Sequence, residues 1–190
     1  MSGQVIALKE WASAIEALRN GQQILIMRKG GIREETRDFQ IESESFYLYP
    51  TYEHQRRELL KEEYQYQLDE TLRGWSSQDT EAVIRCYAEL TEDILIASQE
   101  ELDRLKGEHI WTDRFAEERV KWKRAQPLHL MLLRVYELTE PVRVSILPEY
   151  NGCKSWIGLP AAALDAAERR PVLSDEQYAE RINTIKSLLG

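Results

Sequence analysis

The sequence predicts an α+β fold in which a mixed or mainly antiparallel sheet packs with several helices. Residues 83–90 alternate between apolar and polar side chains, as a half-exposed strand does. Residues 128–138 are apolar on both faces, which is typical of a central strand that is covered on both sides. Segments with helical periodicity occur along the chain, but strands and helices do not alternate as regular βαβ units.

The N-terminal part is expected to form a helix followed by a hairpin. Apolar residues recur at helical spacing over residues 7–19, and an Asn-Gly pair then supplies a stop signal. Residues 22–31 and 39–49 have the composition of strands. The stretch 30–38 between them is polar and rich in glycine at its start, which favours a long hairpin tip.

The segment FYLYPTYEHQ, residues 46–55, is expected to lead from the second strand into a second helix. Pro50 ends the strand, and Thr51 is the expected N-cap of a helix over residues 52–72. Apolar residues at i, i+4 spacing support this helix, which should end before Gly74. Four side chains lie together at its expected start: Tyr52, Glu53, His54 and Gln55.

Helix signals recur after the strand at residues 83–90. Ser98 and Glu101 form a capping box for a short helix that Gly107 ends. Thr112 is expected to open a longer helix that continues through Lys123.

The C-terminal part combines strands and helices. Residues 142–159 continue the alternating pattern, and the Asn-Gly pair at residues 151–152 favours a tight hairpin turn. Two helices are then expected, one over residues 161–170 and one that follows a capping box at residues 174–177.

Length and composition favour one compact domain over residues 1–190. The chain has 190 residues, of which 43% are hydrophobic, and it contains no run of serine, glycine or proline that would mark a linker. Neither a secretory signal nor a membrane-spanning apolar run occurs, so we expect a cytoplasmic protein in which Cys86 and Cys153 are free thiols. Cys86 should face inward, and Cys153 should be the more accessible thiol.

The formal charge of -8 argues against a broad electropositive surface. Residues 114–134 are an exception, because they hold six cations and two carboxylates. Any contact with nucleic acid should therefore be local.

Several standard chemistries are absent from the sequence. It contains no GxxxxGK P-loop, no GxGxxG fingerprint and no GxSxG serine elbow, so Ser155 is not expected to be a nucleophile. The three histidines show no metal-ligand spacing. We therefore expect neither a metal site nor a cofactor.

The expected binding residues are cationic, polar or aromatic. Trp111, Phe115 and Trp122 share one face of a helix, which is typical either of a core face or of an aromatic platform for stacking bases. Glu53 and His54 are candidate catalytic residues, although adjacent helical side chains diverge by about 100° and would converge only in a turn. The residues expected to bind a ligand are Arg28, Lys29, Tyr52, His54, Gln55, Arg119, Lys121, Trp122, Lys123, Lys154 and Trp156.

Five motifs together resemble a bacterial and archaeal family named domain of unknown function 1802: ALKEWASAIEAL, RKGGIREE, FYLYPTYEHQ, LLRVYELTEPV and EYNGCKSWIGL. The resemblance covers about residues 5–160 and leaves residues 161–190 as a helical extension. It implies an association with restriction-endonuclease domains of the Mrr type, and therefore a nuclease partner protein, but it brings no catalytic residues.

A second resemblance is architectural. The first helix, the GQQILIMRKGG strand and the later LLRVYEL strand are similar to small barrels of the PUA and ASCH kind, which bind RNA or modified bases. This similarity implies that the sheet takes the form of a small PUA-like barrel.

Three functions remain open from the sequence. The leading hypothesis is an accessory module that recognises nucleic acid or a nucleotide and is linked to restriction or defence. The second is a small metabolite enzyme that uses Glu53 and His54 as acid and base. The third is a protein-interaction module without a ligand site.

Overall fold

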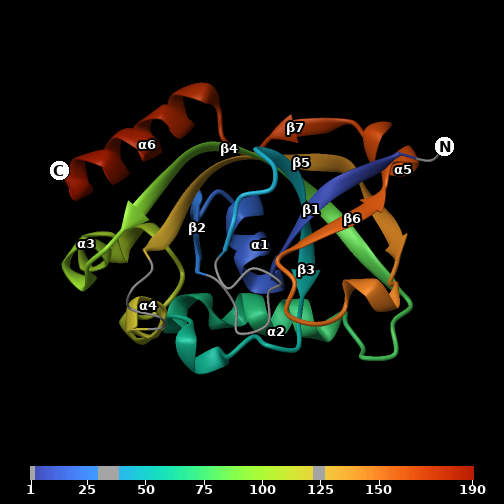
Figure 1. The fold of residues 1–190 in the computed structure, drawn as a ribbon, viewed down its shortest axis with the longest axis horizontal. Helices are drawn as coiled ribbons and strands as arrows, with labels where there is room; N and C mark the ends of the chain where they lie inside the picture. Colours follow the sequence, from blue (N-terminus) through green and yellow to red (C-terminus); the bar gives the residue numbers. More distant parts are fainter. Residues whose placement is uncertain (1–2, 30–38, 122–126) are drawn as a thin grey trace.

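The computed structural model describes residues 3–29, 39–121 and 127–190 (Figure 1). The strands are β1 (Gln4–Trp11), β2 (Leu25–Arg28), β3 (Ser45–Thr51), β4 (Glu81–Ile96), β5 (Leu128–Ser145), β6 (Trp156–Pro160) and β7 (Arg169–Pro171). The helices are α1 (Ala12–Arg19), α2 (Gln65–Arg73), α3 (Gln99–Arg104), α4 (Asp113–Lys121), α5 (Ala161–Asp165) and α6 (Asp175–Leu189). In these ranges no helix has the length and apolar character needed to cross a membrane.

The strands form one mixed sheet, so the expected α+β class is confirmed. Within the described ranges the strand order is β2-β5-β4-β3-β1-β6, and β7 pairs with β5 beyond the end of β2. The pair β1 and β3 is parallel, and the other pairs are antiparallel. No described ladder joins the two edge strands β2 and β6, so the sheet is not a closed barrel.

The expected helix over residues 7–19 is wrong in its first part. The first of these residues belong to a strand, and the sheet that contains it is covered on both faces. Ala7 and Leu8 are neighbours in β1, and both are fully buried, one in each of two hydrophobic clusters. Such a strand is apolar at consecutive positions, so its pattern runs without a break into the apolar face of α1. The helix therefore begins only at Ala12. Figure 1 shows α1 lying between β2 and β1.

The hairpin expected from residues 22–31 and 39–49 does not form. Strand β2 pairs with β5, whereas β3 lies between β1 and β4. Two strands therefore separate β2 from β3 in the sheet. The prediction failed because it paired strands by their order in the sequence, while the sheet pairs them so that each buried strand has partners on both edges. The expected hairpin tip, residues 30–38, lies outside the described residues.

The corner at Thr51 also differs from the expected N-cap. Thr51 is the last residue of β3, opposite Trp11, and its Oγ1 donates a hydrogen bond to the carbonyl of Glu10 at 3.1 Å. Two 3₁₀ turns, Arg57–Leu59 and Glu62–Tyr64, separate this corner from α2. The helix still ends before Gly74, as expected.

The C-terminal part needs two corrections. Strand β6 pairs with β1 rather than with the strand before it, so the Asn-Gly pair at residues 151–152 lies in a connection instead of a tight hairpin. Gly152 has a φ of 89°, a conformation that favours glycine. Residues 161–170 contain the short helix α5 and the start of β7, not one helix.

The capping boxes are confirmed. Ser98 and Glu101 cap α3, and Ser174 and Gln177 cap α6. Helix α6 packs on the main core through Ile185, which is fully buried.

Candidate functional site

A guanidinium group links the two edges of the sheet. Arg28 ends β2, and its Nη1 donates to the carbonyl of Lys9 at 3.1 Å. Its Nη2 donates to Oγ of Ser155, the residue before β6, at 2.5 Å. Side chains rather than a backbone ladder therefore span the gap between β2 and the pair β1 and β6. Side chains from the ends of several strands therefore meet at this gap.

The carboxylate of Glu10 lies beside Arg28 in a fixed position. Only 6% of Glu10 is exposed, and its Oε1 accepts a hydrogen bond from the backbone N–H of Trp11 at 2.8 Å. Its Oε2 lies 3.5 Å from Nη1 of Arg28, which is long for a charge-assisted hydrogen bond. Glu10 is thus oriented by the start of α1, and it compensates Arg28 incompletely.

Buried aromatic rings support Arg28 from the core side. The guanidinium lies over the ring of Phe39 at 5.3 Å, and Trp156 stacks on that ring with centroids 6.1 Å apart. Trp156 donates through Nε1 to the carbonyl of Gln40 at 2.7 Å. Phe39 and Trp156 are both buried. Their rings hold Arg28 in place and do not offer an open stacking surface.

Arg119 on α4 faces the same place. Its guanidinium lies over Phe115 at 4.9 Å, and Phe115 contacts Trp11 edge-on at 5.6 Å. Burial lowers the pKa of Arg119, the charge of Arg28 lowers it further, and the carboxylates of Glu10 and Glu118 oppose both effects. Within the described part of the chain, Arg119 has neither a hydrogen bond nor an ion pair. It is a half-buried cation without a compensating acceptor.

Two lysines complete a group that we call the cationic rim, which consists of Lys9, Arg28, Lys29 and Arg119. Lys29 is 7% exposed, and its Nζ donates to the carbonyl of Val120 at 3.0 Å. Lys9 donates to backbone carbonyls at residues 150 and 152. Burial is the main cause of the lowered pKa of both lysines. Among the described residues, Glu10 is the carboxylate that forms an ion pair with the rim.

An open groove of about 550 Å³ adjoins the rim at Lys29. It runs between the end of β4, the start of α3 and α4. Lys121 lines it and forms an ion pair with Glu117 at 3.3 Å. Glu117 lines the groove as well, and the other lining residues are Ile96, Ala97, Gln99 and Val120. The groove has a mixed polar and apolar lining and is large enough for an extended ligand segment.

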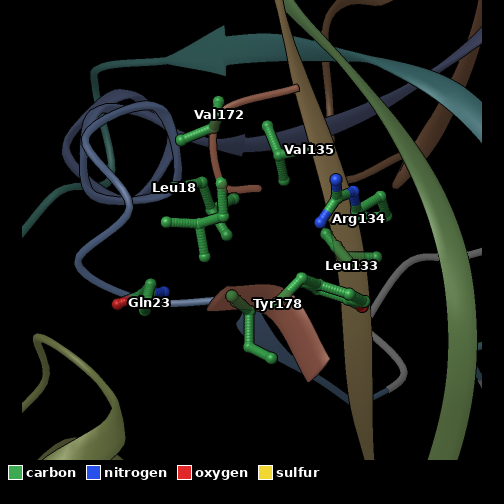
Figure 2. A pocket seen from close by; sticks show the side chains of 9 residues that line it. Leu18, Gln23, Leu133, Arg134, Val135, Val172 and Tyr178 are labelled. Atoms are coloured by element: carbon green, nitrogen blue, oxygen red, sulfur yellow. The ribbon is translucent and has the colours of Figure 1, made fainter. Parts of the chain in front are cut away.

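A second, much smaller cavity lies between α1, β5 and the start of α6. Figure 2 shows Leu18, Val135 and Tyr178 around it, and its volume is about 10 Å³. A space of this size holds at most about one water molecule. The guanidinium of Arg134 at its wall forms an ion pair with Asp175 at 2.8 Å. The cavity is a packing gap under α6 and not a ligand site.

The corner at residues 52–55 is a structural connection. Tyr52 stacks on Trp75 with ring centroids 5.1 Å apart, and the Oε1 of Gln55 accepts a hydrogen bond from the backbone N–H of Ser13 at 2.8 Å. Gln55 therefore caps the start of α1. Glu53 and His54 are exposed in a turn, and no described hydrogen bond or ion pair joins them. The structure thus places Tyr52 and Gln55 in packing roles.

The structure brings some of the expected binding residues together. Arg28, Lys29 and Arg119 belong to the cationic rim, with Trp156 behind it. Lys154 is exposed, and its charge acts on Lys9. Lys121 lies in the adjoining groove. Two further positions, Trp122 and Lys123, lie outside the described residues.

The aromatic residues expected on one helix face belong to the core, and Trp111 precedes α4 and pairs with Leu60 in an isolated β-bridge. Trp111 and Phe115 are 1% and 4% exposed, and their rings stack on each other at 4.7 Å. They do not form an exposed stacking platform. The basic stretch 114–134 is not one surface either, because Arg114 pairs with Glu118 and Arg134 is buried on β5. Ordinary burial of large rings accounts for this outcome.

Sequence reasoning missed Lys9, Glu10, Phe39 and the contact of Ser155 with Arg28. Lys9 and Glu10 were expected on a helix, where they would be ordinary charged surface residues. Their signal was a charged pair at the end of a strand that is otherwise apolar. Among the described residues, no group of three or more His, Cys, Asp or Glu side chains is arranged to hold a metal ion.

Comparisons with known proteins give the following matches. The family model described as Domain of unknown function (DUF1802) matches residues 7–184. The chain is similar to the crystal structure of ASCH from Zymomonas mobilis, with 10% identity and a TM-score of 0.46 over 86% of this chain and 95% of that chain.

Crystal structures of two variants of the same Zymomonas mobilis protein also match. The Tyr-to-Phe variant has 11% identity and a TM-score of 0.47, and the match covers 86% of this chain and 98% of that one. The Ser-to-Ala variant has 10% identity and a TM-score of 0.43, and the match covers 94% of each chain. At this level of similarity, the comparison carries no conclusion about chemistry. A search of curated proteins finds no match.

Proposed function

The chain belongs to the family described as Domain of unknown function (DUF1802), and from the geometry of its own residues we propose that it is a recognition module for nucleic acid or a nucleotide. The cationic rim is the proposed binding site. It would hold a phosphate group of the ligand, and the adjoining groove would bind the next part of the nucleic-acid strand.

The observation that carries this proposal is the excess of poorly compensated positive charge at the rim. The charges of Arg28 and Arg119 act on each other there, Lys9 and Lys29 flank them, and the carboxylate that pairs with Arg28 is Glu10. Burial of a charge without a partner costs free energy, and an anion that enters the site recovers part of it. Guanidinium groups match phosphate oxygens in geometry, which favours phosphate over other anions.

The groove supports a ligand longer than one phosphate. Lys29 lines both the rim and the groove, and Lys121 lies farther along. Successive phosphates of a nucleic-acid strand would contact these cations one after another. The overall charge of -8 opposes non-specific binding, so this contact should be local and sensitive to salt. A module of this kind fits beside a separate nuclease partner, which is the setting that the family resemblance implies.

The test is binding of short single-stranded and double-stranded DNA and RNA at low salt, measured by fluorescence anisotropy. We expect Arg119→Gln to weaken binding by roughly tenfold or more and to reduce the salt slope by about one unit. Arg114→Gln is the matched control, because Arg114 lies on the same helix but is exposed and paired with Glu118 at 3.0 Å. This control should leave affinity nearly unchanged.

Two outcomes would contradict the proposal. One is that the folded wild-type protein binds none of the four nucleic acids. The other is that Arg114→Gln and Arg119→Gln weaken binding equally, which would show that general charge and not the rim controls affinity.

A further inference from the structure

We propose, as an inference that rests on the proposed function, that Glu10 is a specificity-determining residue. Its fixed carboxylate lowers the affinity of the rim for doubly charged phosphomonoesters more than for singly charged phosphodiesters. The ligand class it favours is therefore the internal backbone of a nucleic acid, in competition with free phosphate and terminal phosphate groups.

The geometry puts the carboxylate where it acts on any bound anion. Trp11 N–H holds Oε1 at 2.8 Å, and Oε2 lies 3.5 Å from Arg28. The Arg119 guanidinium lies over Phe115 at 4.9 Å, and that ring contacts Trp11, the residue whose N–H holds Glu10. The charges of Arg28 and Glu10 both act on Arg119 at this place. An anion between the two guanidinium groups would therefore lie close to Glu10. Because Glu10 is 6% exposed, water screens this repulsion less than it screens the repulsion between two exposed charges.

The effect depends on ligand charge. At a separation of about 6 Å and an effective dielectric constant of about 20, one unit of charge feels a repulsion worth roughly a hundredfold in affinity. Salt and residual water reduce this to about tenfold for each charge. A phosphodiester carries one negative charge, and a phosphomonoester carries nearly two above a pH of about 6. The same carboxylate therefore penalises the monoester by about one further factor of ten.

Without Glu10 the cationic rim would favour small, doubly charged phosphates over a nucleic-acid backbone. The cations Arg28 and Arg119 attract a dianion more strongly than a monoanion, so small free phosphates would compete well with a nucleic-acid backbone. Glu10 removes part of that advantage. It does so without blocking the rim, because the Oε2 contact with Arg28 is long and Arg119 forms no described hydrogen bond or ion pair.

The test uses two matched probes, dimethyl phosphate as the monoanion and methyl phosphate as the dianion, at about pH 8. Each probe competes with a labelled oligonucleotide that lacks a terminal phosphate. Glu10→Gln removes the charge and keeps an oxygen that accepts from Trp11 N–H. Glu53→Gln is the control, because the exposed Glu53 acts on Lys9 without contacting the rim. Glu10→Ala is the second variant if Glu10→Gln does not fold.

We expect Glu10→Gln to raise the affinity for dimethyl phosphate about tenfold and the affinity for methyl phosphate about a hundredfold. Glu53→Gln should change either affinity by less than about twofold. An equal gain for the two probes would overturn the inference and leave the proposed function standing. No gain for either probe would also overturn it. Failure of the folded wild-type protein to bind the oligonucleotide and both probes would overturn the proposed function itself.

Discussion

Lowering the pH from 7 to 4 should destabilise the protein through one buried imidazole. His109 is 3% exposed, and its Nδ1 has no hydrogen-bond partner in the described part of the chain. Burial lowers the pKa of His109 to about 4, and the neighbouring ammonium of Lys61 contributes in the same direction. Lys61 donates to the carbonyl of His109, so its charge is held beside the ring.

The size of the effect follows from the two pKa values. An unfolded histidine has a pKa of about 6.5, so between pH 6.5 and 4 the unfolded chain binds a proton that the folded protein excludes. The contribution of His109 to stability is therefore fully present above pH 6.5 and is lost as the pH falls toward 4. Each pKa unit is worth 1.36 kcal/mol, which gives a loss of about 3 kcal/mol at pH 4.

Urea unfolding at several pH values between 7 and 4 measures this loss. In His109→Gln the free energy of unfolding should fall by about 3 kcal/mol less over the same range. His54→Gln is the control, because His54 is exposed, and its pH dependence should follow that of the wild type. An NMR titration of His109 in the native protein checks the same point directly. A native pKa near 6.5, or equal pH dependence in His109→Gln and the wild type, would refute the reasoning.

Two further predictions concern thiols and the corner before α2. Under native conditions a thiol reagent should label Cys153 and spare Cys86, because Cys86 is fully buried and burial raises its pKa to about 12. Mass spectrometry of the labelled peptides measures which thiol reacts, and faster labelling of Cys86 would contradict the prediction. Gln55→Ala should cost about 1 kcal/mol of unfolding free energy, because it removes the cap at Ser13, whereas His54→Ala should cost less than about 0.5 kcal/mol. Equal losses in the two variants, measured by urea unfolding, would contradict the capping role.

The candidate site was only partly accessible to sequence reasoning. Arg28, Lys29 and Arg119 were among the residues expected to bind a ligand, and Arg119 was expected beside the aromatic face of its helix. Glu10 was not expected, since its role depends on the end of β1 lying beside the end of β2. These two strand ends are far apart in the strand order, and the Arg28 side chain brings them together across the open gap.

The fold shows the same division between local and distant information. The capping boxes at Ser98 and Ser174, the end of α2 before Gly74 and the central strand β5 were all predictable, because each depends on side chains within a few residues of one another. The pairing of β2 with β5 and of β6 with β1 was not, because strand partners are chosen by burial of both sheet faces and by saturation of backbone hydrogen bonds over long distances. Local periodicity therefore determined which segments are strands and helices, whereas tertiary packing decided which strand ends meet and so where the cationic rim lies.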